Sequence, residues 1–110
     1  MRELALHILD LVQNSIEAGA DRVLLEIVED FRADTLTIRV ADNGRGMDDD
    51  TRRRALDPFM TTRKTRRVGL GLPLIDMTTR QCGGYLTIDS AAGRGTTVEA
   101  MYRQIGRAHV

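Results

Sequence analysis

Three glycine-containing segments follow one another in a fixed order, and this order constrains the fold more than any other feature of the chain. Asp42-Asn43-Gly44-Arg45-Gly46-Met47 comes first, Val68-Gly69-Leu70-Gly71-Leu72 follows, and Ala92-Gly93-Arg94-Gly95-Thr96-Thr97 comes last. Glycine lets a backbone turn tightly or approach a ligand without a Cβ clash. Each segment alone is also typical of an ordinary turn. Together with Asn14 upstream, the three predict a pocket for a purine nucleotide and its phosphates.

The composition is that of a single globular domain. The chain has 110 residues, 42% of them hydrophobic and 29% charged, which suits one core. Sixteen basic and sixteen acidic residues cancel, so net charge points to neither a nucleic-acid nor a membrane partner. Cys82 is the only cysteine, which excludes an internal disulfide and favours a reducing, cytoplasmic location. No apolar run approaches the length of a membrane span, about 18 residues. We expect residues 1–103 to form the domain and 104–110 a tail.

Hydrophobic periodicity predicts three helices and four strands. Residues 3–18, 48–56 and 72–81 favour helices, and residues 22–28, 36–40, 85–88 and 97–102 favour strands. Residues 61–68 show no periodicity, and we expect a mobile loop there. This order predicts an α/β fold of the α+β two-layer type, with a helical layer on one face of a mixed, largely antiparallel sheet.

The first predicted helix has two stripes. Its apolar stripe consists of Leu4, Ile8, Leu11, Val12, Ser15 and Ile16, and its polar stripe of Glu3, His7, Asp10, Asn14 and Glu17. A polar stripe is usually the solvated face of an amphipathic helix, and we expect His7 to belong to it. Asp10 and Asn14 are four residues apart, so both can face one cavity. An Asn carbonyl is a plausible Mg²⁺ ligand, and Asp10 could orient or deprotonate a nucleophile.

Two further segments offer chemistry suited to a nucleotide. Asp42 ends a predicted strand, where a carboxylate can accept from the adenine amine and reject guanine, although Asn43-Gly44 is also a common hairpin turn. The segment from Gly69 to Leu72 opens a predicted helix, whose first N–H groups can hold phosphate oxygens. The preceding loop, residues 61–67, combines threonines with four cations. It suits a flap over a triphosphate, a solvated basic loop, or a patch for nucleic-acid phosphates.

These residues together resemble the GHKL superfamily, which comprises histidine-kinase ATP-binding domains, DNA gyrase, Hsp90 chaperones and MutL-type ATPases. The resemblance runs from about Glu3 to Met101 in five ordered boxes. They are Asn14, Asp42-x-Gly44-x-Gly46, Asp57-Pro58-Phe59-Met60-Thr61-Thr62, Gly69-Leu70-Gly71-Leu72 and Gly93-x-Gly95-Thr96. It implies the Bergerat fold, with ATP and Mg²⁺ bound between helices and a flexible lid.

The resemblance also implies roles for individual residues. Asn14 would hold Mg²⁺, Asp42 would contact the adenine amine, and Asp10 and Lys64 would be the candidate catalytic residues. Lys64 and the backbone of residues 69–72 would face the phosphates, and Thr96 or Thr97 would line the adenine side. The expected ATP-binding set is Asn14, Asp42, Gly44, Gly46, Met47, Thr62, Arg63, Lys64, Gly69, Leu70, Gly71, Leu72, Thr96 and Thr97.

Features within the superfamily point in two directions. Residues 57–72 and 93–98 resemble a bacterial sensor histidine kinase, whereas residues 11–20 are more similar to gyrase and MutL. Those ATPases have Glu where this chain has Asp10, and histidine kinases often have a cation where it has Glu17. Neither His7 nor His109 lies in the pattern of a phosphoacceptor hairpin. The acceptor of a kinase would therefore lie on another segment or on a protein partner.

The leading interpretation is the ATP-binding catalytic domain of a histidine-kinase-like protein in signal transduction. One alternative is a stand-alone serine kinase of the anti-sigma type. Others are an ATP-gated switch with weak ATPase activity, and a fold relative that no longer binds nucleotide. We expect a protein acceptor or regulatory partner rather than nucleic acid.

Overall fold

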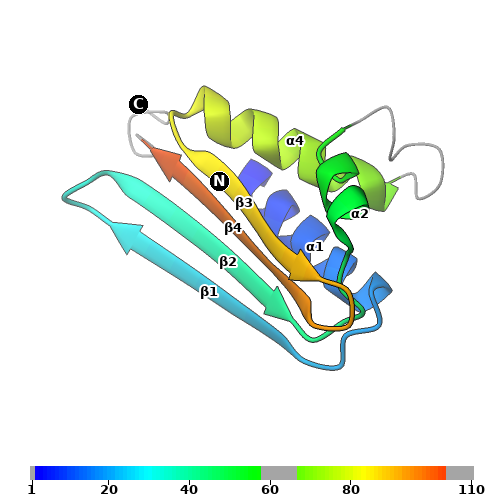
Figure 1. Ribbon diagram of the computed structural model, residues 1–110. Helices are drawn as coiled ribbons and strands as arrows, with labels where there is room; N and C mark the ends of the chain where they lie inside the picture. The colour runs from blue at the N-terminus through cyan, green and yellow to red at the C-terminus, as the bar shows by residue number, and fades with distance from the viewer. Residues whose placement is uncertain (1, 58–66, 104–110) are drawn as a thin grey trace.

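The computed structural model describes residues 2–57 and 67–103, and within them the helices and strands follow the predicted order (Figure 1). The N-terminal half contains α1 (Arg2–Glu17), β1 (Val23–Asp30), β2 (Thr35–Asp42) and α2 (Asp49–Arg54). The C-terminal half contains α4 (Arg67–Gln81), β3 (Tyr85–Ala91) and β4 (Gly95–Arg103). The loop expected at residues 61–68 lies largely outside the described residues.

The four strands form one sheet in the order β1-β2-β4-β3. All three neighbouring pairs are antiparallel, so the expectation of a mixed sheet is wrong for the described residues. The cause is the connectivity: β1–β2 and β3–β4 are hairpins, whose short links join antiparallel strands. The sheet places the last residue of β2 beside the start of β4, with Asp42 directly opposite Thr96.

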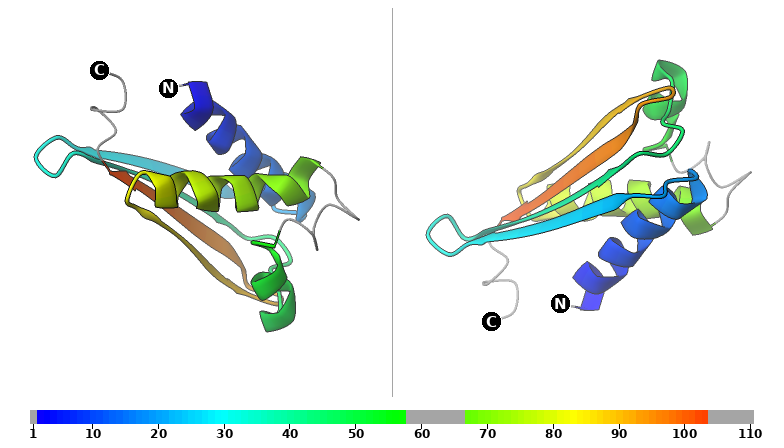
Figure 2. Two further views of the ribbon diagram at one scale, coloured as in Figure 1. Left: turned by 90° about the horizontal axis from the view of Figure 1, so that it is seen from above. Right: turned by 90° about the horizontal axis from the view of Figure 1, so that it is seen from below.

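The helices cover one face of the sheet, as predicted, and the other face is open (Figure 2). α1 packs against β2, and α4 packs against β3 and β4. In the buried core, alternate residues of β2 and β4 meet the two helices. Its fully buried side chains include Leu11, Ile38, Val40, Ile75, Ala100 and Tyr102. Among the described residues, no helix is both long and apolar enough to cross a membrane.

Two residues of α1 lie where the sequence does not predict them. His7 is buried, with 8% of its surface exposed, and its Nδ1 lies 2.8 Å from the hydroxyl of Tyr102. A buried tyrosine hydroxyl requires a polar partner, and His7 meets this need at the end of β4. Ile16, expected on the apolar stripe, is 57% exposed. The buried face of α1 is therefore rotated toward His7 relative to the face that hydrophobicity alone predicts.

The shorter helices also differ from expectation at their ends. α2 begins after Asp48, whose carboxylate accepts a hydrogen bond from the Thr51 N–H at 2.8 Å. This bond lowers the pKa of Asp48. α4 begins at Arg67 rather than at Leu72, so Pro73 lies inside the helix and not in its first turn. Proline costs the helix one hydrogen bond but does not prevent it from continuing.

Candidate nucleotide site

The carboxylate of Asp42 is held from two sides at the end of β2. The hydroxyl of Ser15 donates to Oδ2 at 2.6 Å, and the backbone N–H of Gly44 donates to Oδ1 at 2.9 Å. Ser15 is only 2% exposed, so water does not compete for its hydrogen bond. These contacts fix the direction of the carboxylate and leave further lone pairs on both oxygens.

The two glycines that follow Asp42 are required by close contacts within the protein. A Cβ on Gly44 would lie 2.8 Å from the backbone oxygen of Ala18, to which Arg45 donates at 2.9 Å. Gly46 has a φ of +71°, and a Cβ there would lie 2.1 Å from the carbonyl oxygen of Ala91. The turn is therefore pressed between the end of α1 and the end of β3. Any approach of these glycines to an adenine ring is a prediction.

Asn43 ties the same turn to the loop after α1. Its Oδ1 accepts from the backbone N–H groups of Asp21 and Arg22, both at 3.0 Å. Its Nδ2 donates to the carboxylate of Asp21 at 2.7 Å. Through these hydrogen bonds, Asn43 holds the turn against residues Asp21 and Arg22 on the solvent-exposed side.

A second serine, Ser90, links Met47 to Thr96, and Thr96 is the partner of Asp42 in the sheet. The hydroxyl of Ser90 accepts from the Met47 N–H at 2.8 Å and lies 2.7 Å from the hydroxyl of Thr96. Thr96 shares the helix-covered face with Asp42, its partner in the sheet. Thr97 is the next residue on β4 and therefore lies on the open face. Of the two threonines, Thr96 is the one positioned to line the site.

The polar stripe of α1 faces α4. A Cβ on Gly71 would lie 3.1 Å from Cβ of Asp10 and 3.4 Å from its Oδ2, so a larger residue there would crowd this carboxylate. Asn14 is one turn further along α1, and its Oδ1 is buried with no hydrogen-bond partner among the described residues. A buried amide oxygen without a partner is costly. Among the described residues, the Asn14 oxygen is therefore available to a ligand atom or ion.

The donor atoms of the described residues fit Mg²⁺ only if a bound molecule and water supply its other ligands. In the part of the chain that the structure describes, no group of three or more His, Cys, Asp or Glu residues could hold a metal ion. The Asn14 oxygen is a ligand type that Mg²⁺ accepts, and Mg²⁺ commonly takes its other ligands from phosphates and water. The residues present fit an ion that enters together with a polyphosphate.

The structure thus brings most of the predicted residues together around the end of α1. These are Asp10, Asn14, Asp42, Gly44, Gly46, Met47, Gly71 and Thr96. Gly69 and Leu70 lie in the first turn of α4, and the side chain of Leu72 belongs to the core. Thr62, Arg63 and Lys64 lie outside the described residues.

Three residues that hold the site are not predicted from the sequence: Ser15, Asn43 and Ser90. Ser15 interrupts an otherwise apolar stripe, and a small polar residue there is a usable signal of a buried polar partner. Asn43 was assigned only to a turn, because the residues it bonds are far away in the sequence. For Ser90, the sequence offers no local signal.

The fold and these contacts define a two-layer domain. Around the end of α1 it brings together the Asp42 carboxylate, the Asn14 oxygen that has no partner among the described residues, and the glycine-containing start of α4. Residues 2–104 match the family described as histidine kinase-, DNA gyrase B-, and HSP90-like ATPase. The chain belongs to this family.

Several sensor proteins are similar in sequence to this chain. It is 43% identical over 89 residues to the sensor protein kinase FleS of Pseudomonas aeruginosa, covering 81% of this chain and 22% of that protein. It is 32% identical over 104 residues to the tetrathionate sensor histidine kinase TtrS of Salmonella typhimurium, covering 89% and 17%. The chain thus spans less than a quarter of the length of these two relatives.

Solved structures share the fold of this chain. Full-length ShkA in complex with AMPPNP aligns with a TM-score of 0.68 at 24% identity, over 87% of this chain and 20% of that one. The histidine kinase domain of a blue-light activated kinase from Erythrobacter litoralis aligns with a TM-score of 0.63 at 19% identity, over 94% and 47%. At these identities, the likeness establishes the fold alone.

Proposed function

We propose that residues 1–103 bind ATP with Mg²⁺ and form the catalytic domain of a histidine-kinase-like phosphotransferase. The observation that carries this proposal is the buried Oδ1 of Asn14, which has no hydrogen-bond partner in the described part of the chain and lies on the side of α1 that meets the glycine segment of α4. The similarity to sensor kinases and to a structure containing an ATP analogue supports it.

Asp42 recognises the adenine end in this proposal. Each carboxylate oxygen already accepts one hydrogen bond from the protein and can accept another. The exocyclic amine of adenine is a donor, whereas guanine has a carbonyl at the same ring position. The fixed carboxylate would therefore favour ATP over GTP.

Asn14 and Asp10 serve the phosphate end. Mg²⁺ held by the Asn14 oxygen would supply positive charge to neutralise the phosphates. The carboxylate of Asp10 lies against Gly71, where it can orient an attacking group. Thr62, Arg63 and Lys64 would contact the phosphates from the segment outside the described residues, with backbone contributions from residues 69–72.

The reaction is transfer of the γ-phosphoryl group to a nucleophile outside this chain. The bond from the γ-phosphorus to the bridging oxygen breaks, a bond to the acceptor forms, and ADP leaves with the bridging oxygen. His7 does not suit the acceptor role, because it is buried and bonded to Tyr102. A protein acceptor must therefore present its side chain to the site.

Calorimetric titration with ATP, with and without Mg²⁺, tests the binding. Asn14→Ala should abolish the gain in affinity from Mg²⁺ and leave Mg²⁺-free binding unchanged. Gln13→Ala is the matched control, because Gln13 is exposed and bonds Glu17. Asp42→Asn should weaken ATP by about 1.5–3 kcal/mol, the range for a hydrogen bond to a charged group, whereas Asp89→Asn on β3 should not. Equal affinities in all variants would refute the site.

Transfer is tested with γ-labelled ATP and isolated helical hairpins that bear an exposed histidine. The proposal requires an acid-labile label on the hairpin, and this label must be lost in the Asp42→Asn variant. Tight ATP binding without labelling of any hairpin would refute the phosphotransferase and retain the nucleotide site.

The contact between Asp10 and Gly71 favours a second candidate, a slow ATPase that acts as a switch. There Asp10 would take a proton from the attacking water. Asp10→Asn should abolish turnover while ATP affinity stays within about twofold. Turnover at the parental rate would exclude Asp10 as the base.

A further inference from the structure

The hydroxyl of Ser90 makes three polar contacts near the end of β3. Its oxygen lies 2.8 Å from the backbone nitrogen of Met47, 3.0 Å from the carbonyl oxygen of Gly95 and 2.7 Å from the hydroxyl oxygen of Thr96. Ser90 is the partner of Thr96 in the sheet, and Thr96 is the partner of Asp42. The three side chains therefore form a row across β3, β4 and β2 on the helix-covered face.

The number of hydrogens determines the direction of each contact. A serine hydroxyl has one hydrogen and two lone pairs. The Met47 N–H can only donate, so it occupies one lone pair of Ser90. The Gly95 carbonyl can only accept, so it takes the Ser90 hydrogen. The third contact is then a hydrogen bond only if Thr96 donates to Ser90. In the reverse direction, the Ser90 and Gly95 oxygens would face each other without a hydrogen between them.

Thr96 is consequently an acceptor on the side of the candidate site. Its single hydrogen is held by Ser90, and the lone pairs on its oxygen are available to a ligand. Thr96 is half-buried, so a ligand can reach it. For Thr96 to donate to a ligand instead, Ser90 would have to turn its own hydrogen from Gly95 to Thr96, and one hydrogen bond would be lost. Ser90 therefore sets the direction in which Thr96 acts.

Other hydrogens near the Asp42 carboxylate are also directed into the protein. The hydroxyl of Ser15 and the N–H of Gly44 donate to this carboxylate. The N–H groups of Asn43 and Arg45 donate to backbone carbonyl oxygens that precede the turn. Among the described residues, this end of the site therefore presents acceptors and few donors.

We propose that Ser90 is a positioning residue that makes the candidate site selective for purines with an amine at position 6. This inference rests on the proposed binding of ATP. A 6-amino group carries hydrogens for the acceptors of Asp42 and Thr96, whereas a 6-oxo group is itself an acceptor and needs a donor. The Thr96 hydrogen could serve a 6-oxo group if it were released. By accepting this hydrogen, Ser90 leaves the 6-oxo group without a partner.

Ser90 also holds the turn that contains Met47, so its loss has a structural effect as well. The turn lies close to β3, because a Cβ on Gly46 would be 2.1 Å from the carbonyl oxygen of Ala91. A displaced turn would weaken the binding of every purine nucleotide by a similar factor. A released Thr96 hydrogen would favour only a base with an acceptor at position 6. Nucleotides that differ at this position separate the two effects.

Calorimetric titration with ATP and with ITP, each with Mg²⁺, measures the selectivity. The two bases differ only along the edge that includes position 6, so the ratio of the ITP to the ATP dissociation constant reports on this edge. Ser90→Ala should lower the ratio by about three- to tenfold, the effect of one hydrogen bond. Ser90→Thr keeps the hydroxyl on a residue that suits a strand, and should keep the ratio within about twofold of the unmodified chain.

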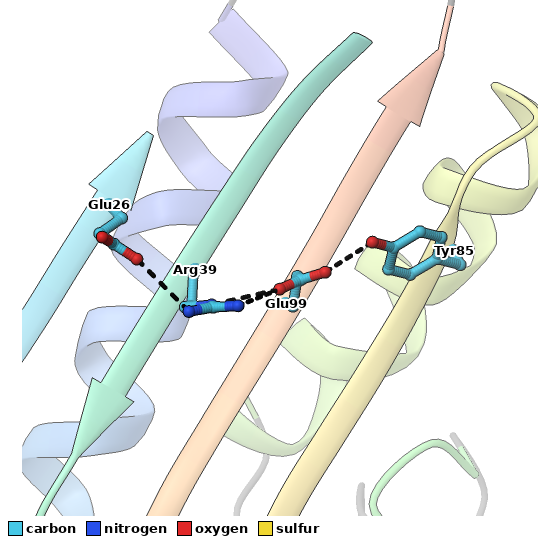
Figure 3. Close-up of polar contacts among 4 residues, drawn as sticks. All are labelled: Glu26, Arg39, Tyr85 and Glu99. Carbon is cyan, nitrogen blue, oxygen red and sulfur yellow. Dashed lines mark hydrogen bonds and ion pairs between the residues drawn. The ribbon is translucent and has the colours of Figure 1, made fainter. Parts of the chain in front are cut away.

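Tyr85→Phe is the matched control on the same strand. It removes a hydroxyl that donates to Glu99 on the open face of the sheet, away from the candidate site (Figure 3). The ratio should stay unchanged in this variant. If Ser90→Ala and Tyr85→Phe lowered the ratio equally, or if Ser90→Ala weakened ATP and ITP by the same factor, the role of Ser90 in selectivity would be refuted.

A second variant tests whether the effect passes through Thr96. Thr96→Val keeps the shape of the side chain and removes the hydroxyl. In this background, Ser90→Ala should change the ratio by less than about twofold, because no hydrogen remains to be released. A change as large as in the unmodified chain would overturn the argument.

The unmodified chain offers a test that does not depend on the folding of any variant. The triphosphate of purine riboside has neither an amine nor an oxygen at position 6. An end of the site with acceptors only should bind ATP most tightly, this analogue less tightly and ITP least. Tighter binding of ITP than of the analogue would overturn the inference while leaving the nucleotide site intact. A chain that binds none of the three would refute the proposed function itself.

Discussion

Removing the hydroxyl of Ser15 should destabilise the unliganded protein chiefly through Asp42, because its contact with the Leu11 carbonyl is much longer, at 3.4 Å. The hydrogen bond is 2.6 Å long and its donor is 2% exposed. A hydrogen bond to a charged group contributes about 1.5–3 kcal/mol, and we expect the lower end because Asp42 is only half-buried. Ser15→Ala should therefore lower the free energy of unfolding by about 1.5 kcal/mol. With a urea slope of about 1–1.5 kcal/mol/M, the midpoint falls by roughly 1 M.

A double-mutant cycle shows whether this loss passes through Asp42. Ser15→Ala, Asp42→Ala and the double variant are unfolded in urea without nucleotide, so ligand affinity does not enter. The two single losses should exceed the double loss by at least about 1 kcal/mol. The control cycle pairs Ser15→Ala with Asp89→Ala, where distant sites should be additive within about 0.5 kcal/mol. A coupling between Ser15 and Asp42 below that limit would refute the reasoning.

Three further outcomes follow from the contacts. Gly46→Ala should lower the free energy of unfolding in urea by more than about 2 kcal/mol, because its Cβ would meet a carbonyl oxygen at 2.1 Å. Gly93→Ala is the control, with a similar φ of +80° and open space around it, and should lower this free energy by only about 1–2 kcal/mol. Equal losses would contradict the steric argument. Tyr102→Phe removes the 2.8 Å contact to His7 and should lower stability by about 0.5–1.5 kcal/mol; an unchanged midpoint would show that this contact contributes nothing. Hydrogen bonds from its tyrosine and arginine neighbours lower the pKa of Glu99 below its ordinary 4.5. Its contribution is therefore present above that value and is lost as the pH falls through the lowered folded pKa. Glu99→Gln should flatten the stability profile below about pH 4.5, and an unaltered slope there would exclude this origin.

The order of the elements was predictable, because each element has its own local signal. The alternation of Leu36, Ile38 and Val40 predicted the half-buried strand β2, and helical spacing predicted α1. Asp42 and Asn14 could be identified as candidates by residue type and position. The start of α4 at Arg67 could not, because glycine and proline discourage a helix locally and packing overrides them. His7 was misplaced for a similar reason, since its partner Tyr102 is distant in the sequence.

α1 carries residues of the candidate site on one stripe and the exposed side chains of Leu9 and Ile16 on another. The stripe of Asp10 and Asn14 faces α4, and the stripe of Leu9 and Ile16 faces away from it. Between them, the stripe that includes Leu11 is buried on the sheet. A close-packed core transmits a displacement only by moving whole elements. A change at Leu9 or Ile16 can therefore reach the candidate site only by shifting α1 against β2, where the hydrogen bond between Ser15 and Asp42 would resist it.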